Sequence, residues 1–277
     1  MSSVSSTAPA EASVSNGAHT GARVVLAAVA HPDDIEFMLA GTLLELKHAG
    51  WEIHFWNLAN GNCGSMEHSR EEIAAIRARE AAASAALAGA TWHEPLFDDL
   101  GVFYDAPSLA KVASVVRQVN PAMILTHCPT DYMEDHQNVC RLIVTAAFSK
   151  EMPNFQAVPS TPAVSGSVRI YHALPHGLRD GLGRPVIPDV YVDIGDVLET
   201  KRALLACHDS QKKWLDASQG MDAYLEEMLR LCGEMGKLSG RFDHAEGFLR
   251  HSHLGFCPAD HDPLVGALAT SEKVTEP

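Results

Sequence analysis

Residues 24–34 read VVLAAVAHPDD, an apolar run followed at once by one imidazole and two carboxylates. The run from Val24 to Val29 is continuously apolar, as expected of a strand that is buried on both faces of a parallel sheet. A helical pattern follows from Ile35 to Ala49 and ends at Gly50. The stretch therefore predicts a strand–turn–helix unit of an α/β protein, with polar side chains at the carboxyl end of the strand.

The same alternation of strands and helices continues along the chain. It predicts an α/β fold with a doubly wound, Rossmann-like, mostly parallel sheet that carries helices on both faces. The part after residue 150 is less regular, because two of its segments are rich in Pro and Gly and predict loops. The expected strands cover residues 52–58, 91–96, 122–126, 168–172 and 190–194, and the expected helices cover residues 69–87, 108–119, 136–149, 196–207 and 222–233.

The length of 277 residues favours one large domain or two small ones, and we expect a single domain over residues 23–260. Residues 1–22 are rich in Ser and Ala without a basic start or an apolar run, so we expect a disordered tail and a cytoplasmic protein. Residues 261–277 are expected to form a loose C-terminal tail. The six cysteines form no C-x-x-C pair, which favours free thiols.

The formal net charge is −14, from 35 acidic and 21 basic residues. Such a surface repels phosphate backbones, so nucleic acid is not an expected partner. No apolar run reaches the roughly 18 residues of a membrane helix, so we expect no membrane span. We expect a small-molecule substrate as the partner, and a homo-oligomer is compatible with the sequence.

A second polar motif, TDYMEDH at residues 130–136, follows the predicted strand that ends at Thr126. The exits of two strands in one parallel sheet meet at one crevice. Catalytic zinc commonly takes three N or O ligands and keeps one position for water, a count that His31, Asp34 and His136 would supply. Asp34 is also a good helix N-cap by residue type, so a capping role is the alternative for that residue.

The string AHPDD after one apolar strand, paired with DYMEDH after another, resembles the PIG-L/LmbE family of zinc-dependent N-acetyl-sugar deacetylases. The resemblance runs from about Val24 to about Gly255. Further matches are the Gly-containing loop of residues 60–65, the Arg77-x-x-Glu80 pair on a helix, and the string His208-x-Ser210-Gln211.

The resemblance implies a deacetylase-like catalytic domain that holds one Zn²⁺ per chain through His31, Asp34 and His136. His and Asp ligands also accept other divalent metals. It implies that Asp33 is the general base that deprotonates the metal-bound water. Asp135, which directly precedes a ligand, is expected to orient that ligand.

One position departs from the family pattern. The family often has a His where this chain has Met133, and a thioether donates no proton. Tyr132 is therefore the first candidate to donate a hydrogen bond to the oxyanion, and His208 is the second. Met133 is expected to shape the pocket with its apolar bulk.

Three further residues are candidates for substrate binding, each with a plain alternative. Arg77 matches a family position that contacts substrate, but it could instead be a solvated side chain paired with Glu80. Asn60 and Gly61 could let the backbone approach the substrate, but they suit an ordinary turn equally well.

The favoured function is a metal-dependent hydrolase that removes an N-acyl group, first of all N-acetyl, from an amino sugar or glycoconjugate. N-acetylglucosamine is the first choice of sugar. Two alternatives keep the fold, namely a hydrolase of another N-acyl amide and a non-catalytic sugar-binding relative. A dinucleotide-binding oxidoreductase is disfavoured, because the first strand lacks G-x-G-x-x-G.

Overall fold

The computed structural model describes residues 23–212 and 224–277, which form one eight-stranded sheet of order β3-β2-β1-β4-β5-β7-β6-β8. Strands β3, β2, β1, β4 and β5 are parallel, and β7, β6 and β8 are antiparallel to their neighbours. The predicted α/β fold with a mostly parallel sheet is thereby confirmed. The strands are β1 (Val24–Val29), β2 (Glu52–Asn57), β3 (Thr91–His93), β4 (Met123–Thr126), β5 (Arg169–Ala173), β6 (Val190–Asp193), β7 (Ala245–Arg250) and β8 (Val274–Thr275).

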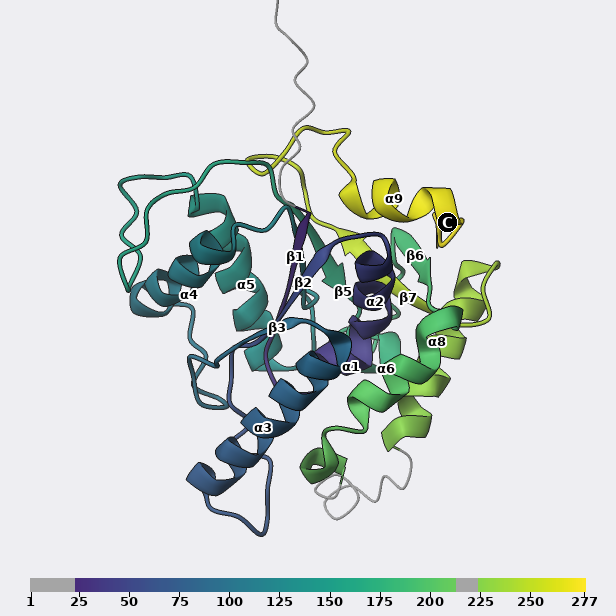
Figure 1. Cartoon of the computed structure of the whole chain (residues 1–277), viewed down its shortest axis with the longest axis horizontal. Coiled ribbons are helices and arrows are strands. Elements are labelled where there is room, and N and C mark those ends of the chain that lie inside the picture. The colour runs from purple at the N-terminus through teal and green to yellow at the C-terminus, as the bar shows by residue number, and fades with distance from the viewer. Residues whose placement is uncertain (1–22, 213–223) are drawn as a thin grey trace, which may run out of the picture.

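Helices cover both faces of this sheet (Figure 1). Alternate residues of β1 explain the two layers: Leu26 and Ala28 pack with α4 and α5, whereas Val25 and Ala27 pack with α2, α6, α8 and α9. The strand is buried on both sides, as its apolar run predicts. The helices are α1 (Asp34–Met38), α2 (Ala40–His48), α3 (Arg70–Ala88), α4 (Ala106–Val119), α5 (Glu134–Ser149), α6 (Leu198–Leu205), α8 (Tyr224–Ser239) and α9 (Pro263–Leu268).

The strand order places a crevice beside β1. The chain leaves β1 towards β2 on one side of the sheet and leaves β4 towards β5 on the other. Adjacent parallel strands whose connections diverge leave an opening at their carboxyl ends, where α/β proteins bind ligands. The segments that follow Val29 and Thr126 therefore meet at this opening.

The helix predicted from Ile35 to Ala49 is interrupted at Leu39, so that α1 and α2 are separate. The buried carboxylate of Glu246 explains why a new helix begins there. It accepts the backbone N–H groups of Gly41 and Thr42 at the start of α2, both at 2.8 Å. These free amides of a helix N-terminus need an acceptor when they are buried.

The prediction of a loose C-terminal tail is wrong. Leu264 and Leu268 of α9 are buried in the core, and β8 pairs with β6. The side chain of Asp262 caps α9 and accepts a hydrogen bond from Tyr171 at 2.6 Å. Apolar packing and a cap thus hold a segment that looked featureless in sequence.

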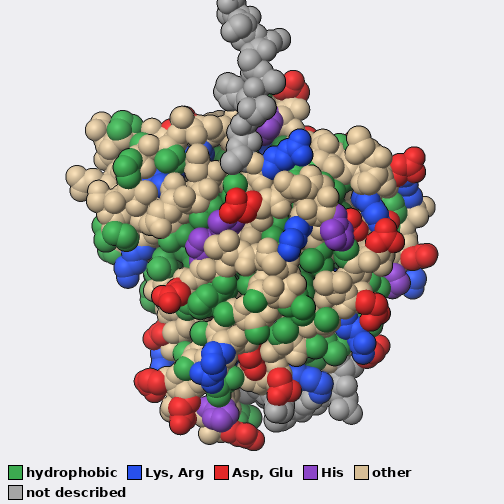
Figure 2. All heavy atoms as spheres, in the orientation of Figure 1, with side chains coloured by type: hydrophobic (Ala, Val, Ile, Leu, Met, Phe, Trp, Pro, Cys, Tyr) green, Lys and Arg blue, Asp and Glu red, His purple; other side chains and the backbone are tan. Residues whose placement is uncertain are grey.

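The N-terminal tail expected at residues 1–22 lies outside the described residues. All six cysteines are free thiols, as predicted. Within residues 23–212 and 224–277, no helix is long and apolar enough to cross a membrane. On the face drawn in Figure 2, acidic and basic side chains are interspersed.

Candidate active site and metal centre

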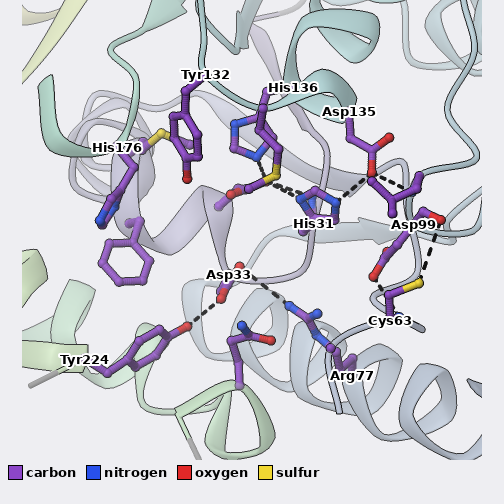
Figure 3. Close-up of a pocket in the computed structure, with 17 residues that line it drawn as sticks. His31, Asp33, Cys63, Arg77, Asp99, Tyr132, Asp135, His136, His176 and Tyr224 are labelled. Atoms are coloured by element: carbon purple, nitrogen blue, oxygen red, sulfur yellow. Dashed lines mark hydrogen bonds and ion pairs between the residues drawn. The ribbon is translucent and has the colours of Figure 1, made fainter. Parts of the chain in front are cut away.

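A cavity of about 450 Å³ opens at the carboxyl ends of β1 and β4. Both polar motifs contribute to its lining, together with side chains from α3 and α8 (Figure 3). Its size is that of a small-molecule site. The topology therefore brings segments about a hundred residues apart in sequence into one pocket.

The turn after β1 has a specific backbone conformation. Asp33 adopts φ 101°, a left-handed conformation that is strained for a residue other than Gly. The backbone N–H of His31 donates to Asp34 Oδ2 at 2.7 Å, and the side-chain amide of Asn57 donates to the carbonyl oxygen of His31 at 2.6 Å. These contacts fix the turn so that three ionisable side chains line the cavity.

The three predicted ligands lie together. Asp34 Oδ2 is 3.6 Å from His31 Nδ1 and 3.4 Å from His136 Nε2, and one donor atom from each residue lies within 4.8 Å of the others. His136 Nε2 is buried and has no hydrogen-bond partner among residues 23–212 and 224–277. This set of two imidazoles and one carboxylate, with an unpartnered nitrogen facing the carboxylate, fits a divalent metal ion.

The electrostatics of this group favour a cation. Burial alone would lower the pKa of the His31 imidazole, but the adjacent Asp135 and Asp34 carboxylates outweigh it and raise the pKa to about 10. The same carboxylates stabilise any positive charge at this place.

A carboxylate lies behind each imidazole. His31 Nε2 is 3.0 Å from Asp135 Oδ2, and His136 Nδ1 is 3.1 Å from Asp131 Oδ1. A carboxylate on one ring nitrogen leaves the other nitrogen free to bind a metal. Asp135 was expected to orient its neighbour in sequence, His136, but it contacts His31 instead, and Asp131 faces His136.

A second cluster, His127, Asp131 and His136, also has donor atoms within 4.8 Å of one another. Its two imidazole rings are stacked, with centroids 3.8 Å apart and planes 8° apart. Lone pairs in two parallel ring planes do not converge on one ion. His127 Nε2 already accepts the backbone N–H of Ala30 at 2.8 Å, and burial lowers the pKa of His127 to about 4. We therefore interpret His127 as a neutral side chain that packs against the ring of His136.

The carboxylate of Asp33 is held from two sides (Figure 3). The Tyr224 hydroxyl donates to its Oδ2 at 2.7 Å, and Arg77 Nη2 lies 3.7 Å from its Oδ1. Burial raises the pKa of Asp33 to about 6, and the Arg77 guanidinium opposes that rise. A carboxylate with a pKa near neutrality is suited to accept a proton during a reaction.

Arg77 is buried and lines the cavity. Its guanidinium donates to the carbonyl oxygen of Pro32 at 2.6 Å, while Glu80 accepts hydrogen bonds from Ser210. The alternative of a solvated Arg77–Glu80 pair is therefore wrong.

Tyr132 and Met133 both line the cavity, and the phenol group of Tyr132 points into it (Figure 3). The side chain of Tyr132 is half-exposed, and its ring packs edge-on against the ring of His136. Burial of the phenol raises its pKa, so the hydroxyl stays protonated and can donate a hydrogen bond.

The other predicted site residues do not line the cavity. His208 is buried behind it, and its Nε2 is 3.2 Å from Glu36 Oε1. Burial disfavours the charged imidazole of His208, but Glu36 outweighs burial and raises its pKa. Asn60 donates to Asp98, and Gly61 accepts from Arg77. None of these three residues lines the cavity, whereas Cys63 and Gly64 do, so a role for His208, Asn60 or Gly61 in catalysis or substrate binding stays a prediction.

Sequence reasoning missed Tyr224, Asp131 and Gln211. From the string His208-x-Ser210-Gln211 we expected His208 to act at the site, whereas Gln211 is the member that lines the cavity. Tyr224 lies 191 residues from Asp33 on an ordinary amphipathic helix, so no local pattern marks it.

Residues 26–147 match the family PIG-L: GlcNAc-PI de-N-acetylase. That match covers both polar motifs and all three candidate ligands. The match supports the PIG-L/LmbE family for this chain. It agrees with the resemblance seen in the sequence.

Two relatives of this chain have different names and activities. The chain is 28% identical over 246 residues to the diacetylchitobiose deacetylase of Thermococcus kodakarensis, covering 86% of this chain and 87% of that one. It is 26% identical over 205 residues to the 4-oxalmesaconate hydratase of Pseudomonas putida, covering 70% of this chain and 76% of that one. The structure of the N,N'-diacetylchitobiose deacetylase of Pyrococcus horikoshii aligns with a TM-score of 0.71 and 24% identity over 88% of this chain and 89% of that one.

Proposed function

We propose that this protein is a metal-dependent N-deacylase that removes an acetyl group from an amino-sugar-containing substrate, with N-acetylglucosamine as the first choice of sugar. The observation that carries the proposal is the convergence of Asp33 with His31, Asp34 and His136 in one pocket. The family and the deacetylase relative support the same chemistry.

In this proposal His31, Asp34 and His136 hold the metal, with zinc the first choice and other divalent metals compatible with the ligands. A divalent metal at this place polarises the acyl oxygen and lowers the pKa of water. Asp131 and Asp135 keep the two imidazoles in the required tautomers through the contacts described above.

The protein's own groups then carry the protons. Asp33 takes a proton from the water that attacks the amide carbon, and its position between Tyr224 and Arg77 keeps the carboxylate aimed at the reacting bond. Tyr132 donates a hydrogen bond to the developing oxyanion, a task that Met133 cannot perform. The amine leaves after it receives a proton, which we assign to Asp33 in its protonated state.

The hydratase relative suggests a second candidate, the addition of water to a C=C bond of an anionic substrate. The charges that line the cavity disfavour it. Four carboxylates line the cavity against a single Arg or Lys, namely Arg77, among the described residues. The guanidinium of Arg77 is already engaged by Pro32 and faces Asp33. A neutral acylated sugar avoids the repulsion that a polyanion would meet.

The test is a parallel assay of both reactions on one metal-loaded preparation. Acetate release is measured with N-acetylglucosaminides and with non-sugar N-acetyl amides, and hydration is measured with unsaturated di- and tricarboxylates. The proposal expects acetate and a free amine in equal amounts from a sugar substrate. Turnover of the carboxylates without acetate release would transfer the assignment to the hydratase candidate.

A further inference from the structure

Leu100 is a cavity residue with a strained backbone and an exposed apolar side chain. Its backbone has φ 59°, the residue lines the cavity, and 68% of its surface is exposed. A left-handed backbone is strained for Leu because Cβ approaches the following carbonyl oxygen. Gly or Asn would fit this position with less strain. Leu100 therefore combines backbone strain with an exposed apolar side chain.

Leu178 has the same backbone conformation as Leu100 but a different side-chain environment. Leu178 also has φ 59°, but its side chain is partly buried and packs with Leu174, Tyr191 and Met235. Packing gives Leu178 a structural reason to be apolar. Leu100 belongs to none of the hydrophobic clusters formed by residues 23–212 and 224–277. Backbone strain that side-chain packing does not offset is typical of functional positions.

The turn that carries Leu100 is fixed to the metal centre. The backbone N–H of Leu100 donates to Asp135 Oδ2 at 2.7 Å, the same oxygen that lies 3.0 Å from His31 Nε2. The carboxylate of Asp99, the preceding residue, accepts the backbone N–H groups of Gly61 and Cys63 at 2.7 and 3.0 Å. The backbone of Leu100 is thus held beside the proposed metal centre.

We propose that Leu100 is a specificity-determining residue that covers an alkyl or aryl group of the substrate beside the metal. This inference rests on the proposed function, from which the amino sugar of the substrate is taken. The apolar group can be the aglycone of the amino sugar or its N-acyl chain, since either can extend from the reacting amide along the cavity. Phe37, Met38 and Met133 give the cavity further apolar lining.

The experiment measures binding and turnover with two matched pairs of probes. The first pair is methyl and hexyl N-acetylglucosaminide, and the second is the methyl glycoside with an N-acetyl or an N-hexanoyl group. Affinity is measured by calorimetry on metal-loaded Asp33→Asn protein, in which turnover is slow, and kcat/KM is measured on protein with Asp33 intact. We expect one hexyl- or hexanoyl-bearing probe to bind about 10-fold more tightly than its short partner.

Variants of Leu100 decide whether this residue is responsible. Leu100→Asn should bring the long-to-short ratio close to one without lowering the melting temperature, because Asn tolerates the left-handed backbone. Leu100→Gly serves the same purpose if the Asn variant folds poorly, and Leu100→Met should keep the ratio. Glu272→Gly is the control, because Glu272 has φ 56° and is exposed away from the cavity. It should leave the ratio unchanged.

The outcomes separate this inference from the proposed function. Acetate release with a ratio that is independent of residue 100 overturns the inference and leaves the deacylase assignment intact. A Leu100-dependent ratio in binding, without release of any acyl group, keeps the inference and overturns the assignment. If no probe binds and none is hydrolysed, both are overturned.

Discussion

At the scale of single residues, the orientation of Asp33 is the feature on which the proposed chemistry depends most. Its backbone is left-handed, and both of its carboxylate oxygens face a donor, one from α3 and one from α8. Burial, followed by Asp33, raises the pKa of Tyr224 well above its usual range, so the phenol remains a donor. Such a fixed carboxylate is positioned before substrate binds.

The first prediction concerns Tyr224→Phe, which removes the hydroxyl and keeps the ring that packs on Phe37. A hydrogen bond to a charged group is worth about 1.5–3 kcal/mol, so we expect kcat to fall by roughly 10-fold or more while the metal content stays the same. The same change made in Asp33→Asn protein should cost little, because groups that act as a unit are not additive. Equal losses in both backgrounds would show that Tyr224 acts independently of Asp33.

The second prediction concerns Tyr132→Phe. Removal of one oxyanion donor typically lowers kcat by on the order of 10²-fold, and KM should change less. The measurement is steady-state kinetics of acetate release, with His208→Ala as the comparison variant. His208 is buried against Glu36, so its loss is expected to affect stability more than the KM for substrate. An unchanged kcat in Tyr132→Phe would remove Tyr132 from the mechanism.

The residue types at the strand exits were sufficient to predict that His31, Asp34 and His136 lie together, because imidazoles and carboxylates directly follow two apolar strands. Asp131 could not be distinguished from Asp135 by sequence, since both lie in the same string and only the turn geometry decides which imidazole each one faces. His208 was misplaced because a motif match does not say which of its members faces the cavity.

At the scale of elements, the start of α2 depends on a buried ion pair. Glu246 of β7 accepts two backbone amides of α2 and lies 2.6 Å from Lys201 Nζ of α6, and Lys201 also donates to the carbonyl oxygen of Phe37 at 2.9 Å. Both side chains are fully or almost fully buried. This pair joins three elements beside the cavity wall that contains Phe37.

The third prediction is that Lys201→Met destabilises the fold by about 3–5 kcal/mol, because it leaves the Glu246 carboxylate buried without a cation. Urea unfolding of metal-loaded protein measures the change. The double variant Lys201→Met with Glu246→Gln should recover part of the loss. A Lys201→Met protein as stable as the parent would mean that water or another group compensates the charge.

The parallel strands and their helices could be predicted because each is a continuous apolar or periodic segment between Gly or Pro residues. Strand β7 was missed because AEGFLR carries a Glu and an Arg and shows no clean alternation. Its buried Glu is explained only by Lys201 and the start of α2, which are distant in sequence. Strand β8 has two residues, too few for any pattern.

At the scale of the whole molecule, the proposed metal joins the turn after β1 to the first turn of α5. These segments are about a hundred residues apart, and without a cation the Asp33, Asp34, Asp131 and Asp135 carboxylates repel one another there. An ion that binds only the folded state stabilises it by RT ln(1 + [L]/Kd). Metal binding should therefore stabilise the entire fold.

The fourth prediction is that chelation lowers the melting temperature, and that zinc at about 100 times its Kd restores about 2.7 kcal/mol of stability. His136→Ala protein should show no such response, because it lacks one of three ligands. Calorimetric scans with and without chelator measure both. An equal response in His136→Ala would place the metal elsewhere.

The most direct test of the central claim is the rate of acetate release from an N-acetylglucosaminide by metal-loaded wild-type and Asp33→Asn protein, with metal content measured on both samples. The account predicts release by the wild type, the same metal content in both proteins, and a rate roughly 10²- to 10⁴-fold lower in Asp33→Asn, since an amide cannot accept the proton. Equal rates in the two proteins, or no release by the wild type while a C=C bond is hydrated, would contradict it.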